Sequence, residues 1–239
     1  MFHLIDWETW PRRDHFKYYY NQIKCRYTLT AHIDIAPLRE FQKQRQLRFF
    51  PLMLYAIMRA VNENREFRMS FDGDGRLGYW DVVVPCYTVF HERDKTFSDI
   101  WSEYDADLQA FYDGVAADME TYKDGEGFVK AKPNQPPNFC PVSAVPWLHF
   151  TSFSQDTYAE NSLLFPLIRF GKFEAAGKKV LLPLAVSVHH AVADGYHTCK
   201  LINDIEAAAA KKMEAAVEFA MNSPEPDPAH VLCIVYNST

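Results

Sequence analysis

Positive charge is in deficit in this sequence, and cysteines are few. Among 239 residues, 25 Lys and Arg stand against 31 Asp and Glu, so the net charge is -6. Proteins that bind nucleic-acid phosphates usually carry a basic excess, and no nucleic-acid partner is expected. The five cysteines are odd in number and far apart in the chain. This pattern argues against a disulfide framework or a zinc knuckle and favours a reduced, cytoplasmic protein.

Long apolar segments and repeats are also lacking. No apolar run approaches the roughly 18 residues that a membrane span requires, so no membrane association is expected. The first residues have neither the basic nor the apolar region of a signal peptide, which again favours the cytoplasm. The share of hydrophobic residues, 48%, is that of an ordinary globular protein. Aromatic residues are abundant, with 18 Phe and 13 Tyr, and we expect some of them to line a pocket or a subunit interface.

Hydrophobic periodicity predicts a mixture of strands and helices. Strict alternation of apolar and polar residues over 27–35 is typical of a half-buried strand. Further strands are predicted near 68–81 (a hairpin), 87–91, 142–153, 163–170 and 180–190. Helices are predicted near 14–24, 37–46, 50–64, 97–122 and 195–218. Because they do not alternate in a regular βαβα rhythm, the predicted fold class is α+β with a mixed, mostly antiparallel sheet.

The most distinctive local pattern is His-His-Ala-Val-Ala-Asp-Gly at 189–195. His190 follows an apolar strand and has the same parity as Val186 and Val188, so it belongs to that face of the strand. Its position between a buried strand and the start of a helix at Asp194 would hold a neutral imidazole rigidly, which suits a general base. From spacing alone, a core histidine is the commoner interpretation. A zinc site is disfavoured because the pattern lacks the i, i+4 pairing of HExxH.

Six blocks, in this order along the chain, carry a resemblance to a known family: WPRRDHF, EFRMS, PCYTVFHE, TFSDIWSEY, VPWLHFTSF and HHAVADGYH. Together they resemble the chloramphenicol acetyltransferases from about residue 7 to about residue 212. HHxxxDG alone is shared with dihydrolipoyl acyltransferases, plant acyltransferases and condensation domains, so the combination carries the specificity. The resemblance implies an α+β two-layer sandwich whose mixed, mostly antiparallel sheet is covered by helices. We expect a single acyltransferase domain over 1–213 and a C-terminal extension over 214–239, part of it without fixed structure.

The resemblance also implies a reaction and the roles of four residues. The protein would transfer an acetyl group directly from acetyl-CoA to a hydroxyl of chloramphenicol within a ternary complex, conferring antibiotic resistance. His190 would be the general base, and Ser143 would donate a hydrogen bond to the oxyanion of the intermediate. An ion pair of Asp194 with Arg12 would fix the loop that carries the base. Acetyl-CoA is expected as co-substrate, with no permanently bound cofactor and no metal, in a homotrimer whose active sites lie between subunits.

The same resemblance implies two sets of binding residues. Each aromatic residue among them is equally compatible with a place in the core, and each cation with a solvated surface charge. The acceptor would meet Tyr19, Cys25, Tyr27, Phe97, Phe153 and Arg169, and coenzyme A would meet Arg48, Trp147 and Lys172.

Two positions depart from the family pattern and leave the acceptor open. Arg169 stands where the family has a threonine that holds a water, and Gln155 stands where part of the family has a leucine. Both make the pocket more polar, which favours a second hypothesis, the same fold acting on another alcohol or thiol. A dihydrolipoyl-type role is less favoured because no lipoyl domain or linker precedes Trp7. A third hypothesis, a non-catalytic scaffold, is disfavoured by the presence of all four residues expected in the reaction.

Overall fold

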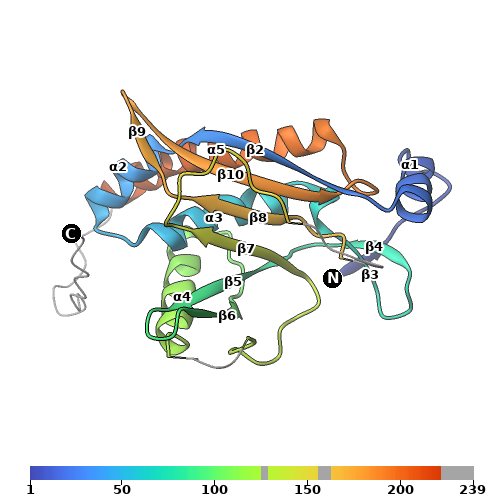
Figure 1. Cartoon of the computed structure of the whole chain (residues 1–239), viewed down its shortest axis with the longest axis horizontal. Coiled ribbons are helices and arrows are strands. Elements are labelled where there is room, and N and C mark those ends of the chain that lie inside the picture. Colours follow the sequence, from blue (N-terminus) through green and yellow to red (C-terminus); the bar gives the residue numbers. More distant parts are fainter. Residues whose placement is uncertain (125–128, 156–162, 222–239) are drawn as a thin grey trace.

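A mixed β-sheet runs through the centre of the molecule (Figure 1). The structure is a computed structural model that describes residues 1–124, 129–155 and 163–221, with side chains as far as residue 210. In spatial order the sheet consists of β2 (Arg26–Asp34), β10 (Lys179–His189), β8 (Leu167–Gly171), β7 (Phe139–Val145), β5 (Val84–His91) and β6 (Thr96–Trp101), with β9 (Glu174–Ala176) beside β10. The neighbours β5, β7 and β8 are parallel and the other pairs are antiparallel. The predicted mixed, mostly antiparallel sheet is confirmed.

Helices pack on the sheet and on one another to form the core. They are α2 (Ala36–Arg45), α3 (Phe49–Glu63), α4 (Leu108–Thr121) and α5 (Gly195–Met221). Helix α3 is apolar almost all round, and its side chains over 51–61 are buried nearly throughout. Such a helix is stable only when other elements enclose it, and here α2, α4 and α5 pack beside it. The sheet face that carries Leu182, Leu184 and Val186 is fully buried in this core.

A small second sheet and three short helical segments complete the described N-terminal half. The sheet has the order β1 (Phe2–Leu4), β4 (Leu77–Trp80) and β3 (Met69–Phe71), so the hairpin predicted over 68–81 is confirmed. The segments are α1 (Arg13–Lys17), the π-helix η1 (Tyr18–Ile23) and the 3-10 helix η2 (Arg65–Arg68). Gly78 is required in β4, because a Cβ there would lie 2.3 Å from the carbonyl oxygen of His3.

The single helix predicted over 97–122 is wrong in its first part. Residues 96–101 form β6, which pairs with β5 across a turn at 92–95. The apolar positions 97, 100, 101 and 104 fit helical spacing, but the inward side chains of the actual strand are Ser98 and Ile100. The helix starts later, where the carboxylate of Asp107 accepts a hydrogen bond from the Ala110 N–H at 2.9 Å.

The strand predicted over 142–153 ends at Val145, and the chain then crosses the second face of the sheet. We call residues 146–155 the strap. His32 donates a hydrogen bond to the Phe150 carbonyl at 3.2 Å, and the Phe153 N–H donates to the Thr30 hydroxyl at 3.4 Å. Because the strap covers this face, β10 is buried on both sides along its central part, as its continuous apolar run predicts.

Pro183 lies within β10 at a place where its missing N–H costs little. One edge of β10 pairs with β9 over 179–181 and with β8 over 184–187, so the ladder on that edge is interrupted at residues 182–183. Proline is tolerated in a sheet at such interruptions.

The C-terminal helix agrees with the prediction at its start and runs further. Helix α5 begins at Gly195 and continues to Met221, past the domain end expected at residue 213. The remainder of the expected extension, residues 222–239, lies outside the described residues. In the part of the chain with described positions, no helix combines the length and apolarity that a bilayer crossing demands.

Candidate active site

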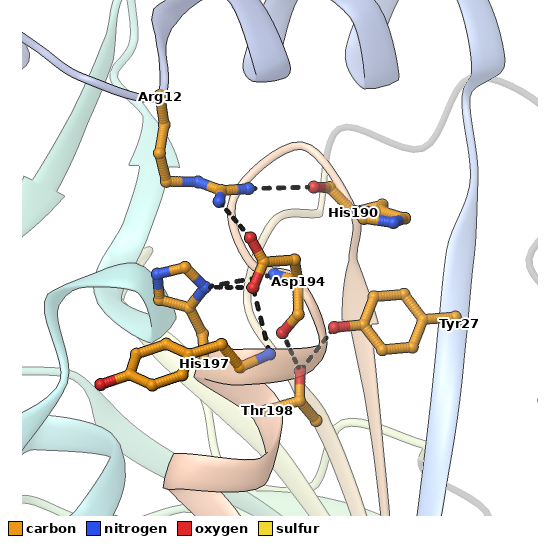
Figure 2. A network of polar contacts seen from close by, with 7 residues as sticks. Arg12, Tyr27, His190, Asp194, His197 and Thr198 are labelled. Atoms are coloured by element: carbon orange, nitrogen blue, oxygen red, sulfur yellow. Dashed lines mark hydrogen bonds and ion pairs between the residues drawn. The ribbon is translucent and has the colours of Figure 1, made fainter.

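His190 lies where β10 ends and the chain turns toward α5 (Figure 2). Its backbone N–H donates to the Cys25 carbonyl at 3.1 Å, and its carbonyl accepts from Arg12 at 3.4 Å. Its ring stacks on Tyr19 with a centroid distance of 3.7 Å and an interplanar angle of 6°, and the ring of Tyr27 approaches at 5.0 Å. The Nδ1 atom of His190 is buried and has no hydrogen-bond partner within the described part of the chain. Backbone bonds and two aromatic rings therefore fix the orientation of the half-buried imidazole.

Asp194 clamps the loop that follows His190 (Figure 2). Its carboxylate accepts from Arg12 Nη1 at 2.6 Å and from His197 Nδ1 at 2.8 Å. Partial burial raises the pKa of Asp194, but the hydrogen bonds from Arg12 and His197 outweigh this and lower it to about 2. Arg12 also reaches the His190 carbonyl, so one guanidinium connects the acidic end of the loop to the backbone of the histidine.

Two further members of this network were missed by sequence reasoning. Tyr27 donates to the Thr198 hydroxyl at 2.7 Å, and Thr198 in turn donates to the Asp194 carbonyl at 3.1 Å. His197 and Thr198 lie three and four residues after Asp194, in the first turn of α5, where helical spacing returns side chains to the same side. That spacing was the available signal. Burial raises the pKa of Tyr27, opposed by its hydrogen bond to Thr198, so the phenol stays protonated.

The two adjacent histidines have different surroundings. His189 is buried, and its Nδ1 accepts a hydrogen bond from the Ala191 N–H at 3.2 Å. Burial, followed by the positive charge of Arg26, lowers the pKa of His189 to about 4. His189 is thus a neutral structural residue whose ring is hydrogen-bonded within the turn. The Nδ1 atom of His190, in contrast, has no hydrogen-bond partner among the described residues. Cys25 lies beside it, half-buried, and burial raises the pKa of its thiol.

Ser143 and Arg169 lie side by side on neighbouring strands, away from His190. Ser143 on β7 is in register with Arg169 on β8, which is in register with Ala185 on β10. His190 is two strands and five residues from Ser143, a separation on the order of 20 Å at normal strand spacing and rise. A single chain therefore brings Tyr19, Cys25 and Tyr27 to His190, but not Ser143.

Arg169 contacts the other departure from the family pattern. Its guanidinium donates to Gln155 Oε1 at 2.9 Å and to the Ile168 carbonyl at 3.0 Å. Phe153 lines the same small cavity as Arg169. Phe97, by contrast, lies on β6 opposite Phe90 and is 54% exposed, so within one chain it belongs to neither group.

The residues expected to hold coenzyme A gather at one end of the sheet. The Lys172 N–H donates to the Leu148 carbonyl at 2.9 Å, which puts Lys172 beside the strap residue Trp147. Trp147 is 63% exposed and packs by its edge on Phe90, at 4.8 Å between centroids.

Arg48 joins this group through its neighbour in sequence. The rings of Phe49 and Phe173 pack together, with centroids 5.3 Å apart, so the segments that carry Arg48 and Lys172 are neighbours. Arg48 is exposed at the start of α3, and its N–H donates to the Tyr112 hydroxyl at 2.8 Å. Two solvated cations and an exposed aromatic ring thus share one surface.

Known proteins are similar to this chain in both sequence and fold. The family described as Chloramphenicol acetyltransferase matches residues 1–206. A chloramphenicol acetyltransferase of Clostridium perfringens is 42% identical over 205 residues, which cover 86% of this chain and 93% of that protein. One of Clostridium butyricum is 40% identical over the same shares of the two chains. A solved structure described as a chloramphenicol acetyltransferase, 24% identical, covers 87% of this chain and 100% of its own with a TM-score of 0.75.

Proposed function

Because the chain belongs to the chloramphenicol acetyltransferase family, we propose that it transfers the acetyl group of acetyl-CoA to a hydroxyl of chloramphenicol, with His190 as the general base. The observation that carries the proposal is the imidazole itself, stacked on Tyr19 and fixed at the end of β10. Its Nδ1 is enclosed by protein atoms. The second ring nitrogen, Nε2, is the one that remains to face a substrate.

The proposed reaction uses that geometry. Nε2 of a neutral His190 takes the proton of the acceptor hydroxyl as the oxygen attacks the thioester carbonyl of acetyl-CoA. The resulting tetrahedral oxyanion collapses, the carbon–sulfur bond breaks, and the proton passes to the departing coenzyme A thiolate. No group of the protein forms a covalent bond, so Asp194 and Arg12 act by positioning. They hold the turn between β10 and α5 and, through the His190 carbonyl, the backbone of the base.

Ser143 is proposed to donate to the oxyanion from a neighbouring subunit. One chain separates Ser143 from His190 by two strands and five residues, so both can reach one acetyl group only across an interface. We therefore propose a homotrimer with active sites between subunits. Phe97 and Phe153 would then complete the acceptor pocket from the subunit that supplies Ser143, whereas Tyr19, Cys25 and Tyr27 accompany His190.

Mixing two inactive variants tests this arrangement. Ser143→Ala alone is expected to lower kcat by about 10²–10³-fold, with little change in KM for the acceptor. Trimers reassembled from Ser143→Ala and His190→Ala chains contain some sites with both native residues, so activity is expected to return to a substantial fraction of wild type. The measurement is turnover after co-refolding, compared with each variant refolded alone. No recovery in mixed trimers of verified composition would place both groups in one chain.

Coenzyme A is proposed to lie against Arg48, Trp147 and Lys172. Exposed cations attract phosphates mainly through solvent-screened charge, so each contributes modestly. Lys172→Ala and Arg48→Ala are each expected to raise KM for acetyl-CoA by about 3–10-fold with kcat nearly unchanged, and the difference should shrink in high salt. Initial rates at varied acetyl-CoA measure this, with Lys43→Ala, at an exposed position of α2, as a matched control. An equal rise in the control, or a fall confined to kcat, would remove the assignment.

Acetylation of chloramphenicol with release of the coenzyme A thiol tests the function itself. A second candidate, the same transfer to a different alcohol or thiol, is favoured by one observation, the Arg169–Gln155 hydrogen bond in the proposed acceptor region. Thiol release with chloramphenicol supports the first function, and release only with other acceptors supports the second. We propose a cytoplasmic enzyme, in accord with the free thiols of Cys25, Cys86, Cys140 and Cys199.

A further inference from the structure

A small cavity lies between the strap and the second face of the sheet. It is lined by Thr28 on β2, Arg169 and Leu167 on β8, Ser187 on β10, and Phe153 and Gln155 of the strap. Its walls therefore combine apolar side chains with two hydroxyls, an amide and a cation. The cation is unusual for a site that also contains two large apolar side chains, because a guanidinium in such surroundings normally has an acidic partner.

Arg169 contacts no carboxylate among the residues whose positions are described. Its two hydrogen-bond acceptors, Gln155 Oε1 and the Ile168 carbonyl, are neutral. The negative charge of Asp99 influences Arg169 without forming an ion pair with it, and Asp99 is itself paired with Lys130 at 3.2 Å. A guanidinium has five N–H donors arranged to fit a carboxylate, so Arg169 retains both charge and donors for a further partner.

The nearby Arg26 shows the contrasting arrangement. Its guanidinium is also half-buried, but it donates to three carbonyls, those of Leu163, Phe165 and Ser187, at 2.6, 3.0 and 3.2 Å. It thereby ties the segment after the strap to the sheet. Arg26 does not line the cavity, whereas Arg169 does.

Ser187 supplies a second, independent indication of a ligand. Its side chain is buried, with 6% of the residue exposed, and its hydroxyl oxygen has no hydrogen-bond partner among the residues that the structure describes. A buried hydroxyl without a partner costs free energy. Ser187 and Arg169 line the same cavity from adjacent strands, so one small acceptor-only group would satisfy both.

We infer that this cavity binds a small anionic group such as a carboxylate, with Arg169 as its counter-ion and the Ser187 hydroxyl as an additional donor. The group is either a free small anion or a carboxylate carried by an acceptor molecule, since the two have the same chemistry. The free-anion form is independent of the proposed function, whereas the acceptor form rests on it.

Sodium formate, titrated at constant ionic strength into the full-length protein, tests the site without requiring turnover. We expect a saturable rise of the melting temperature that is lost in Arg169→Gln and shifted to about fivefold higher formate in Ser187→Ala. Arg45→Gln, at an exposed arginine of α2, should respond like wild type. The formate-induced shift is measured within each variant, so a change in basal stability does not affect the comparison.

A second experiment distinguishes the two sources of the anion. Acetylation of benzyl alcohol is compared with that of 4-(hydroxymethyl)benzoate, with and without formate. With a free-anion site, the benzoate has no kcat/KM advantage over benzyl alcohol, whether or not its carboxylate competes with formate. With an acceptor site, displacement of formate is accompanied by a kcat/KM preference for the benzoate that disappears in Arg169→Gln. Both results support an anion site, and failure to acetylate any alcohol would count against the proposed function alone, because formate binding is measured separately.

Two outcomes would overturn the inference. The first is the absence of any saturable effect of formate on wild type; if Arg169→Gln also dissociates the oligomer in that case, Arg169 pairs with a carboxylate of a second copy of the chain, and the cavity is not a ligand site. The second is an equal formate-induced shift in Arg169→Gln, which would indicate an adventitious ion only.

Discussion

Replacing His190 by alanine is expected to lower kcat for chloramphenicol acetylation by roughly 10³–10⁴-fold, the upper part of the range for removal of a general base. The variant keeps Asp194, Arg12 and every backbone contact of the turn, so the binding of acetyl-CoA and chloramphenicol should change little. Steady-state kinetics with both substrates, together with equilibrium binding of each, measure the two effects separately.

Two further variants separate the chemistry of His190 from its packing. His190→Phe retains an aromatic ring to stack on Tyr19 but cannot accept a proton, and it should be as inactive as His190→Ala while melting close to wild type. His15→Ala, at an exposed histidine of α1, should have wild-type kinetics. Turnover within about tenfold of wild type in either His190 variant would exclude this imidazole as the base.

Replacing Asp194 by asparagine should lower both stability and activity. The change removes the charge that pairs with Arg12 and His197 but keeps the side-chain size. Breaking one side of a buried pair costs about 3–5 kcal/mol. Because Asp194 is 35% exposed, solvent screening reduces this, and we expect about 2 kcal/mol. That corresponds to a melting temperature roughly 4–8 °C lower, with kcat reduced about 10–100-fold as the loop that carries the base loosens.

The pH dependence of this stability difference has a defined sign. The folded-state pKa of Asp194 is about 2, below its ordinary value of 3.8, so the folded protein holds the proton less tightly than the unfolded chain. The contribution is therefore complete above about pH 4 and is lost as the pH falls toward 2. His189, whose pKa is also lowered, is present in both proteins, so the difference between them isolates Asp194.

Melting curves of wild type and Asp194→Asn at several pH values measure this difference. Asp113→Asn, at an exposed position of α4, serves as the control, because its carboxylate accepts a hydrogen bond from Gln109 and from no other described residue. A stability difference that is independent of pH between 2 and 6, or absent at pH 7, would contradict the ion pair as the source.

Much of the fold was predictable from the sequence, for a local reason. The alternation over 27–35, the apolar run over 180–190 and the helical spacing over 50–64 correspond to β2, β10 and α3. In each of these segments burial follows one period, so the pattern and the structure agree. Over 97–104 the apolar residues fit helical spacing, and only pairing with β5 decided that residues 96–101 form the strand β6, with Ser98 and Ile100 inward.

The candidate site also has residues that local patterns predicted and residues that they did not. The position of His190, at the end of an apolar strand and before Asp194, was predictable because it depends on strand parity and on the start of a helix. The roles of Ser143, Arg48 and Lys172 came from family resemblance, since nothing about a serine in a strand or a cation on the surface distinguishes it locally.

The sequence by itself determined which residues occupy the strands and helices that local periodicity predicts. These include a histidine after a buried strand, an aspartate at the start of a helix, and an arginine in a strand where the family has threonine. Only the tertiary structure decided which of them meet. It paired Arg12 with Asp194, stacked His190 on Tyr19, and left Ser143 two strands away. These contacts join segments up to 182 residues apart, and no local pattern encodes the register of strands and the packing of rings that create them.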